Sequence, residues 1–173
     1  MKGTVFVYNV YTIYILTFTY NIPFYRMIVK VIDADILYAP EQYIAYQCNC
    51  VSAKLYGVAQ CIANKYPTDK LRGIPGIPGT VTILPSRSKS IQLKSIICMF
   101  AQWAPGEPFA FSRFYPFTYH DSGGMRLYWF KACLDAIDRL NLDTIAMPCI
   151  CVDRPEYEKL VADAKTRFVL YRM

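Results

Sequence analysis

The chain has 173 residues, of which 54% are hydrophobic and 18% charged, and its formal net charge is +6. This length fits one domain with a sizeable core, and the composition excludes an intrinsically disordered chain. The positive charge favours an anionic ligand and is also compatible with nonspecific attraction to nucleic acid. The 7 cysteines form no Cys-x-x-Cys pair and there is 1 histidine, which argues against a zinc site of ordinary ligand spacing. We therefore expect free thiols in a reducing compartment, with four of them as small core residues: Cys48, Cys61, Cys98 and Cys149.

Residues 1–26 differ from the rest of the chain. They are apolar, β-branched and aromatic, and Lys2 and Arg26 are their only charged side chains. Their length fits a signal anchor or a transmembrane span, but the repeated Thr, Asn and Tyr dilute the hydrophobicity and favour a strand. We interpret them as an N-terminal extension, either a strand or a segment translated ahead of a natural start at Met27, with a membrane span as the alternative.

The first domain strand is expected over residues 27–32, where apolar and polar side chains alternate. Asp33-Ala34-Asp35-Ile36-Leu37 follows at the carboxyl end of that strand. A carboxylate in this place can accept a hydrogen bond from the exocyclic amine of a base. Alternatively, it accepts local backbone N–H groups in a turn.

The stretch from Tyr43 to Pro67 predicts a buried strand, a polar loop and a helix. The apolar run from Tyr43 ends at the polar Asn49, and after Gly57 the apolar spacing becomes helical, with one stripe formed by Val58, Cys61 and Ile62. This layout exposes backbone N–H groups at the start of a helix, where a phosphate can bind. Many α/β folds have the same turn without a ligand.

The remaining chain predicts strands over 80–84, 95–100, 144–148 and 168–171, and helices over 126–140 and from 154 or 155 to 165. The helix over 126–140 has a core stripe consisting of Leu127, Phe130, Leu134 and Ile137. The order β-β-α-β-β-α-β-α-β predicts an α/β domain over residues 27–173, with a mixed sheet between helices. Ligands bind such sheets outside the carboxyl ends of strands, where four features fall: Asp35, Asn49, Gln102 and the loop 149–153.

Two loop features leave alternatives. The long loop 105–119 is rich in aromatic residues, which either stack on a ligand or close a small core of their own. His120-Asp121 resembles a catalytic pair, but adjacent residues in an extended segment point to opposite sides. We expect His120 on the surface, beside a helix cap supplied by Asp121 or Ser122.

Several short motifs, in order along the chain, resemble the macro domain, an ADP-ribose-binding module. The first set falls at the family's spacing and consists of Gln47-Cys48-Asn49-Cys50, Gly57-Val58-Ala59 and Lys65-Tyr66-Pro67. Further matching points are Asp33-Ala34-Asp35-Ile36-Leu37, Pro78-Gly79-Thr80-Val81, Ile97-Cys98-Met99-Phe100-Ala101-Gln102, Pro105-Gly106, Asp121-Ser122 and Ala146-Met147-Pro148. The resemblance extends from about Met27 to the C-terminus and implies a three-layer α-β-α macro-domain fold with a mixed central sheet.

The same resemblance implies an ADP-ribose site. Asp35 takes the place of the residue that binds adenine, and Asn49 that of the residue that contacts the distal ribose. The other expected ligand-binding residues are Ile36, Gly57, Val58, Gln102, Ile150, Cys151 and Val152. In hydrolytic relatives the residues matching Asn49 and Asp153 take part in catalysis.

The sequence departs from the family in two places. Lys54 and Tyr56 stand where many relatives have glycines. Residues 149–153 stand where macro domains carry a glycine-rich loop around the diphosphate, and the β-branched Ile150 and Val152 disfavour the positive φ angles of such a loop. Asp153-Arg154-Pro155 resembles a segment of stand-alone ADP-ribosyl hydrolases, but their partner lysine is replaced by Gln102.

Three functions follow from the resemblance. The first is binding of ADP-ribose or of an ADP-ribosylated protein. The second is hydrolysis, which removes ADP-ribose from proteins or phosphate from ADP-ribose 1''-phosphate, through a water positioned by Asn49 or through Asp153. The third is a degenerate macro fold that serves as a protein- or RNA-binding scaffold. We expect an intracellular monomer of viral or stand-alone type, in the cytoplasm or nucleus, with no cofactor, metal or membrane association and with nucleic acid as a secondary partner.

Overall fold

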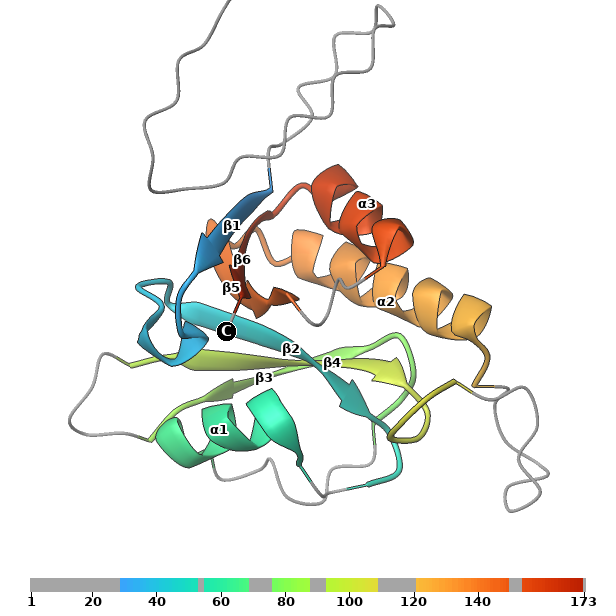
Figure 1. Ribbon diagram of the computed structural model, residues 1–173, viewed down its shortest axis with the longest axis horizontal. Coiled ribbons are helices and arrows are strands. Elements are labelled where there is room, and N and C mark those ends of the chain that lie inside the picture. Colours follow the sequence, from blue (N-terminus) through green and yellow to red (C-terminus); the bar gives the residue numbers. More distant parts are fainter. Residues whose placement is uncertain are drawn as a thin grey trace, which may run out of the picture.

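The strands and α-helices follow one another in the order that the sequence predicts, and a short 3-10 helix that was not predicted lies between the first two strands. The computed structural model describes residues 29–52, 55–68, 76–87, 93–108, 121–149 and 154–172. Within these residues the elements are β1 (Lys30–Asp33), the one-turn 3-10 helix η1 (Ile36–Tyr38), β2 (Tyr43–Asn49), α1 (Gly57–Lys65), β3 (Val81–Pro85), β4 (Ser95–Gln102), α2 (Gly123–Asp138), β5 (Thr144–Pro148), α3 (Pro155–Asp163) and β6 (Arg167–Arg172) (Figure 1). The predicted extension 1–26 and His120 lie outside the described residues.

The six described strands form one sheet in the order β1-β6-β5-β2-β4-β3. All neighbouring pairs are parallel except β3 and β4, which are antiparallel, so the predicted mixed sheet is confirmed. Parallel strands in the middle of a sheet are covered on both faces, so their sequences are continuous runs of apolar residues. β4 shows this plainly, because its residues from Ile96 to Ala101 are all buried.

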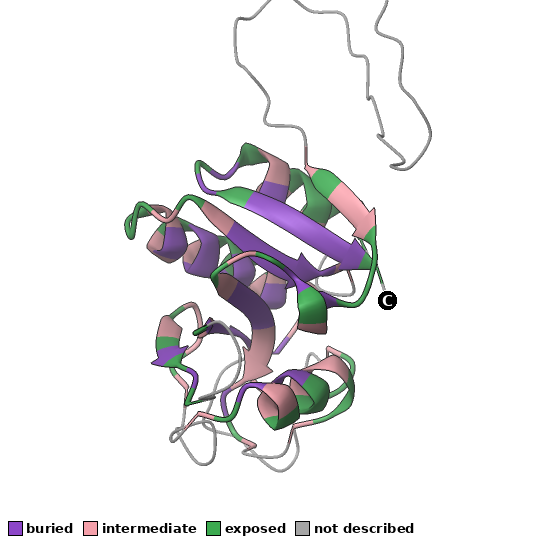
Figure 2. Ribbon diagram, turned by 90° about the vertical axis from the view of Figure 1, so that its left-hand side faces the viewer, coloured by how far each residue is buried: buried purple, intermediate pink, exposed green. Residues whose placement is uncertain are grey.

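Helical elements cover both faces of the sheet. The crossovers through α2 and α3 both run toward the β1 edge, whereas the connection through η1 runs the other way. Because such crossovers are right-handed, α2 and α3 lie on one face and η1 on the other, together with α1, which contacts it. The predicted three-layer arrangement is confirmed. Figure 2 shows the buried residues gathered in the central strands and in the helix faces turned toward them.

The core agrees with the sequence analysis in most places. Phe130, Leu134 and Ile137 are buried as expected, while Leu127 is half-buried. α2 begins three residues before the predicted start, since the Ser122 hydroxyl accepts a hydrogen bond from the N–H of Met125 at 3.2 Å and caps the helix.

The cysteine predictions were partly wrong. Cys98 is buried, and Cys48 and Cys149 are half-buried, but Cys61 is exposed. The short helix α1 buries Ile62, and Cys61 precedes it by about 100° around the helix axis, which turns the thiol toward solvent. No helix in the described residues is long and apolar enough to cross a membrane.

Candidate functional site

The candidate site lies at the edge of the sheet where the parallel strands end. Asp33 of β1 pairs with Arg172 of β6, and Asn49 of β2 pairs with Gln102 of β4. Asp35 follows β1 after one intervening residue, Ala34. All three residues lie at or just beyond the carboxyl ends of parallel strands. Asn49 and Gln102 are direct neighbours, whereas β6 and β5 separate the strand before Asp35 from the strand that ends at Asn49. The expected site residues Ile150, Cys151, Val152 and Asp153 lie outside the described residues.

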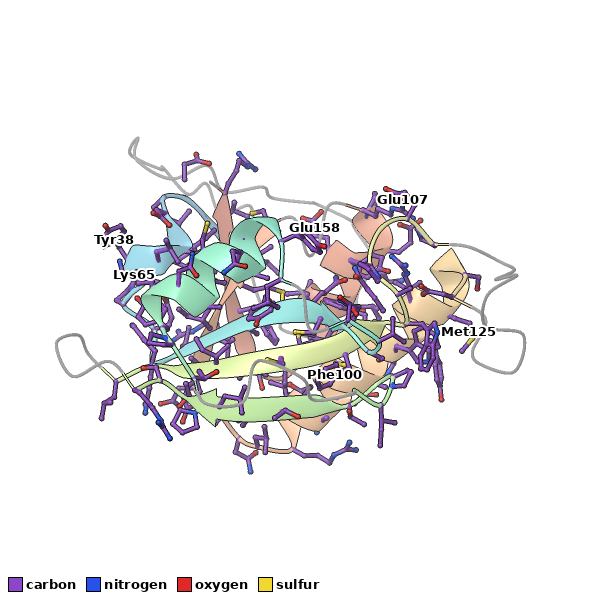
Figure 3. The ribbon with its side chains drawn as sticks, turned by 90° about the horizontal axis from the view of Figure 1, so that it is seen from below. Tyr38, Lys65, Phe100, Glu107, Met125 and Glu158 are labelled. Atoms are coloured by element: carbon purple, nitrogen blue, oxygen red, sulfur yellow. The ribbon has the colours of Figure 1, made fainter. Side chains whose placement is uncertain are left out.

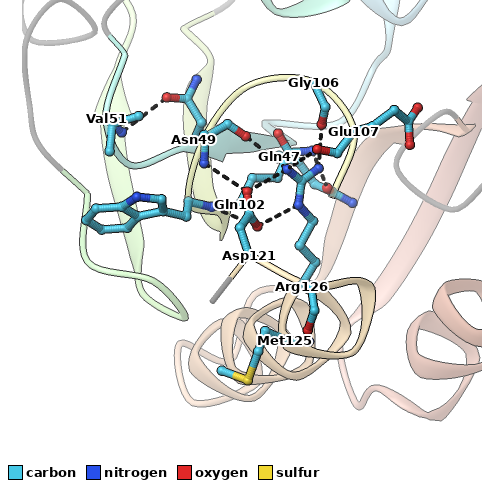
Figure 4. A network of polar contacts seen from close by, with 12 residues as sticks. Gln47, Asn49, Val51, Gln102, Gly106, Glu107, Asp121, Met125 and Arg126 are labelled. Atoms are coloured by element: carbon cyan, nitrogen blue, oxygen red, sulfur yellow. Dashed lines mark hydrogen bonds and ion pairs between the residues drawn. The ribbon is translucent and has the colours of Figure 1, made fainter. Parts of the chain in front are cut away.

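Asn49 holds the loop that follows β2. Its side-chain Oδ1 accepts hydrogen bonds from the backbone N–H groups of Val51 at 3.2 Å and of Ser52 at 2.6 Å (Figure 4). The ladder between β2 and β4 shifts register between Cys48 and Asn49, so the strand bends where Asn49 leaves the sheet. The carboxamide oxygen is thus used within the loop, and the Nδ2 group takes no part in these bonds. Asn49 can offer a ligand its two N–H donors.

α1 starts beyond this loop with an open N-terminus. Gly57 has a φ angle of +54°, a conformation that favours glycine, and a Cβ at this position would meet nothing within 4 Å. The N-cap residue Tyr56 makes no side-chain cap bond, and the first turn contains no acidic residue. Its backbone N–H groups and the positive end of the helix dipole therefore have no side-chain acceptor from the cap position. Val58, in the same turn, is half-buried.

Asp35 is exposed and caps η1. Its Oδ1 accepts the N–H of Leu37 at 2.9 Å, which is the local turn that the sequence analysis considered as one alternative. Ile36 is fully buried, so its side chain belongs to the core and not to the surface of the site. One carboxylate oxygen of Asp35 thus has a structural role, and Oδ2 takes no part in that bond.

The Lys65-Tyr66 motif fixes the segment that carries Asp35. The Tyr66 hydroxyl donates a hydrogen bond to the carbonyl of Leu37 at 2.5 Å, and the Lys65 ammonium lies 3.2 Å from the centre of the Tyr38 ring (Figure 3). Burial, followed by the nearby negative charge of Asp35, raises the pKa of Tyr66. In the sequence this motif is recognisable only by its resemblance to the family. Its physical role is to tie the end of α1 to η1.

Gln102 lies on the β4 side of the site, and a buried ion pair lies in the interior next to the loop that follows β4. The Nε2 of Gln102 donates to Oε1 of Gln47 at 3.2 Å. Below this amide pair, fully buried Asp121 forms two hydrogen bonds with Arg126, from Nε to Oδ1 at 2.7 Å and from Nη2 to Oδ2 at 2.6 Å. From the sequence, either Asp121 or Ser122 was expected to cap α2. The structure assigns that cap to Ser122 and buries Asp121.

A second group missed from the sequence lies at the β1 end of the site. Arg172 and Asp33 form an exposed ion pair with an Nη1–Oδ1 distance of 3.3 Å, and such exposed pairs contribute little to stability. The pKa of the neighbouring Cys149 is raised, mainly by burial. Arg172 opposes this shift, and the carboxylates of Asp33 and Glu158 add to it. Among the described residues no group of His, Cys, Asp or Glu is arranged to hold a metal ion.

No protein-family model matches the sequence, and no curated protein matches it. Solved structures do resemble it. The macrodomain of Mycobacterium tuberculosis DarG has a TM-score of 0.58 and 18% identity, over 83% of this chain and 97% of that one. The macrodomain of Thermus aquaticus DarG has a TM-score of 0.57 and 13% identity, over 84% and 97%. An alphavirus P23pro-zbd has a TM-score of 0.56 and 14% identity, over 83% of this chain but 21% of that chain.

These likenesses define the class of fold. The chain is a three-layer α/β protein whose polar side chains gather at the carboxyl edge of a mainly parallel sheet. More narrowly, it has the macro-domain fold, so the fold that the resemblance implied is confirmed.

Proposed function

We propose that the carboxyl edge of the sheet binds ADP-ribose, free or carried on a protein. The observation that carries the proposal is the open N-terminus of α1, the helix that follows Asn49 in the chain, within a macro-domain fold. N–H groups at a helix start attract phosphate oxygens, the N-cap side chain does not occupy those of α1, and Gly57 places no side chain in the approach. The amide donors of Asn49 would then bind hydroxyl groups of the ribose beyond the phosphates.

The spacing of the strands supports a ligand of this length. β6 and β5 separate β1 from β2, so three strand spacings, about 14 Å, divide the strand that leads to Asp35 from the strand that ends at Asn49. A base at Asp35, a diphosphate at α1 and a ribose at Asn49 would span that interval. Asp35 Oδ2 would accept the exocyclic amine of adenine while Oδ1 keeps its bond to Leu37.

Hydrolysis is a second candidate, and the geometry of Asn49 limits its mechanism. Because Oδ1 already accepts two backbone N–H groups, the side chain can hold a water or a sugar hydroxyl as a donor but cannot take its proton. The base must come from the ligand's own phosphate or from Asp153. Binding can use the donors of Asn49 and of the start of α1, whereas turnover needs a base in addition, and we place binding first.

Calorimetric titration of ADP-ribose into the full chain tests the proposal with the variant Asp35→Asn. Asn keeps an oxygen for the N–H of Leu37, so the turn is preserved, but it removes the charge and presents an N–H group toward the amine. We expect a Kd on the order of micromolar for the native chain. The variant should bind at least about tenfold more weakly, because hydrogen bonds to charged groups contribute about 1.5–3 kcal/mol.

The matched control is Asp135→Ala, which removes an exposed carboxylate on α2 that pairs with Lys131. It should bind as the native chain does. Native protein that is folded but does not take up ADP-ribose would contradict the proposal. Equal losses in both variants would show that the effect is general electrostatics and not recognition by Asp35.

A further inference from the structure

The buried pair Asp121–Arg126 binds an entire loop of the backbone. Beyond its two bonds to Asp121, Arg126 donates to three carbonyl oxygens: Gly106 at 2.6 Å, Ala104 at 3.1 Å and Glu107 at 3.3 Å. Asp121 in turn accepts the backbone N–H groups of Trp103 at 3.4 Å and Ala104 at 3.1 Å. Asp121 thus binds backbone N–H groups of the segment 103–107, and Arg126 binds its carbonyl groups (Figure 4).

The geometry of the pair explains why it is stable in the core. Arg126 is 5% exposed and Asp121 is fully buried. Charges so deeply buried are tolerated only with well-aligned partners, and here the fork of the guanidinium meets the carboxylate with two bonds. Removing one member would leave the other charge buried without a partner. A lysine in the place of Arg126 keeps the charge but has a single nitrogen, which cannot reach the carboxylate and all three carbonyl groups at once.

The clamped segment is joined directly to the end of β2. The backbone N–H of Cys50 donates to the carbonyl of Gln102 at 3.0 Å and to that of Trp103 at 3.1 Å. Cys50 immediately follows Asn49, at the point where the β2–β4 ladder shifts register. The position of Asn49 is therefore set by the backbone of 102 and 103, which the buried pair holds in place.

We infer that Arg126 is a positioning residue for the proposed site: through Asp121 and the loop 103–107 it sets where Asn49 and Gln102 stand, without touching the ligand. The inference rests on the proposed function. The guanidinium lies in the interior behind the loop, so its effect on a ligand passes through the backbone of Trp103 and Ala104 to Cys50. A site built in this way depends on preorganisation, and loosening the clamp weakens binding without removing any ligand contact.

The test compares Arg126→Lys with Ile137→Val, in the full chain. Ile137 is fully buried near the other end of α2, so its truncation lowers stability without touching the loop. Two quantities are measured at a temperature where all proteins are folded: the affinity for ADP-ribose and the hydrogen-exchange rates of individual backbone amides. Arg126→Lys should bind about tenfold more weakly and exchange faster at Cys50, Trp103 and Ala104. Ile137→Val should do neither.

Each other outcome is decisive. Native affinity in Arg126→Lys overturns the inference, and so does an affinity loss that Ile137→Val shares in proportion to its lost stability. If Arg126→Lys does not fold, Asp121→Asn replaces it, because Asn keeps the shape and the acceptor for Ala104 while weakening the bonds from Arg126, and the same outcomes apply. If the native chain binds no ADP-ribose, the proposed function fails. In that case the hydrogen-exchange rate of the Cys50 amide in Arg126→Lys tests the inference by itself. Faster exchange than in the native chain supports the link from Arg126 to the end of β2, and unchanged exchange overturns it.

Discussion

The same substitution, glycine to alanine, should have opposite effects at two positions at the starts of helices. Gly57 begins α1 with a φ of +54°, and Gly124 lies in the first turn of α2 without a positive φ. A Cβ at either position would meet nothing within 4 Å, so neither change creates a clash. Whatever differs between the two variants must come from the backbone conformation.

The magnitudes follow from conformational preferences. An L-residue in the left-handed region costs roughly 1–2 kcal/mol. Gly57→Ala should therefore lower the free energy of unfolding by about 1 kcal/mol, after the smaller entropy of the unfolded alanine chain is counted. Gly124→Ala keeps a helical conformation and should raise that free energy by about 0.4–1 kcal/mol.

Urea unfolding followed by circular dichroism measures both changes. In a chain of this size about 1 kcal/mol corresponds to a shift of roughly 2–4 °C in Tm, which a thermal scan resolves. Gly57→Asn supplies a further control, since asparagine tolerates the left-handed region better than alanine. A Gly57→Ala variant as stable as the native chain would refute the assigned backbone conformation at the start of α1.

Two more predictions concern the core and its response to pH. Gly76 packs against the ring of Phe100 so closely that a Cβ would overlap it, so Gly76→Ala should destabilise the fold by about 1–3 kcal/mol in urea unfolding, and unchanged stability would contradict that contact. Burial raises the pKa of Cys133 from 9.0 to about 12, with a smaller contribution from Cys50. The unfolded thiol loses its proton near pH 9 while the folded one retains it, so this stabilisation is complete below pH 9 and is lost as the pH rises toward 12. The free energy of unfolding should fall by on the order of 1 kcal/mol for this thiol by about pH 10. Cys133→Ala should reduce the slope of the free energy of unfolding against pH, and Cys61→Ala, at an exposed position, should leave it unchanged. Equal slopes in the native chain and both variants would refute the assignment.

Local patterns were sufficient to predict the elements and their order. Apolar runs mark the central strands, and β5 was predicted with its observed bounds, Thr144–Pro148. The carboxyl-edge rule placed Asn49 next to Gln102, because it depends on parallel strands and not on side-chain detail. Helix starts were predicted less exactly. The apolar spacing of α2 predicts a start only at Arg126, whereas the cap at Ser122 starts the helix at Gly123.

What could not be predicted depends on chain segments that meet only in the folded state. Lysine is rarely buried, yet Lys94 is buried, and its ammonium donates to the carbonyls of Ala39 at 2.7 Å and Glu41 at 2.5 Å. Those acceptors are more than fifty residues away in sequence. The pair Asp121–Arg126 could not be predicted for the same reason. On a helix, residues three or four apart are neighbours, so a spacing of five does not indicate a pair, and the other partners of Arg126 belong to the loop after β4.

The most direct test of the central proposal is an NMR titration of the full chain with ADP-ribose. We predict that the backbone amides of Gly57, Val58 and Ala59, the side-chain amide of Asn49 and the amide of Ile36 shift together, with one common Kd. Such a result would locate phosphates, ribose and base on the one edge described above. Shifts confined to other parts of the chain, or none at saturating ligand, would contradict an ADP-ribose site at this edge.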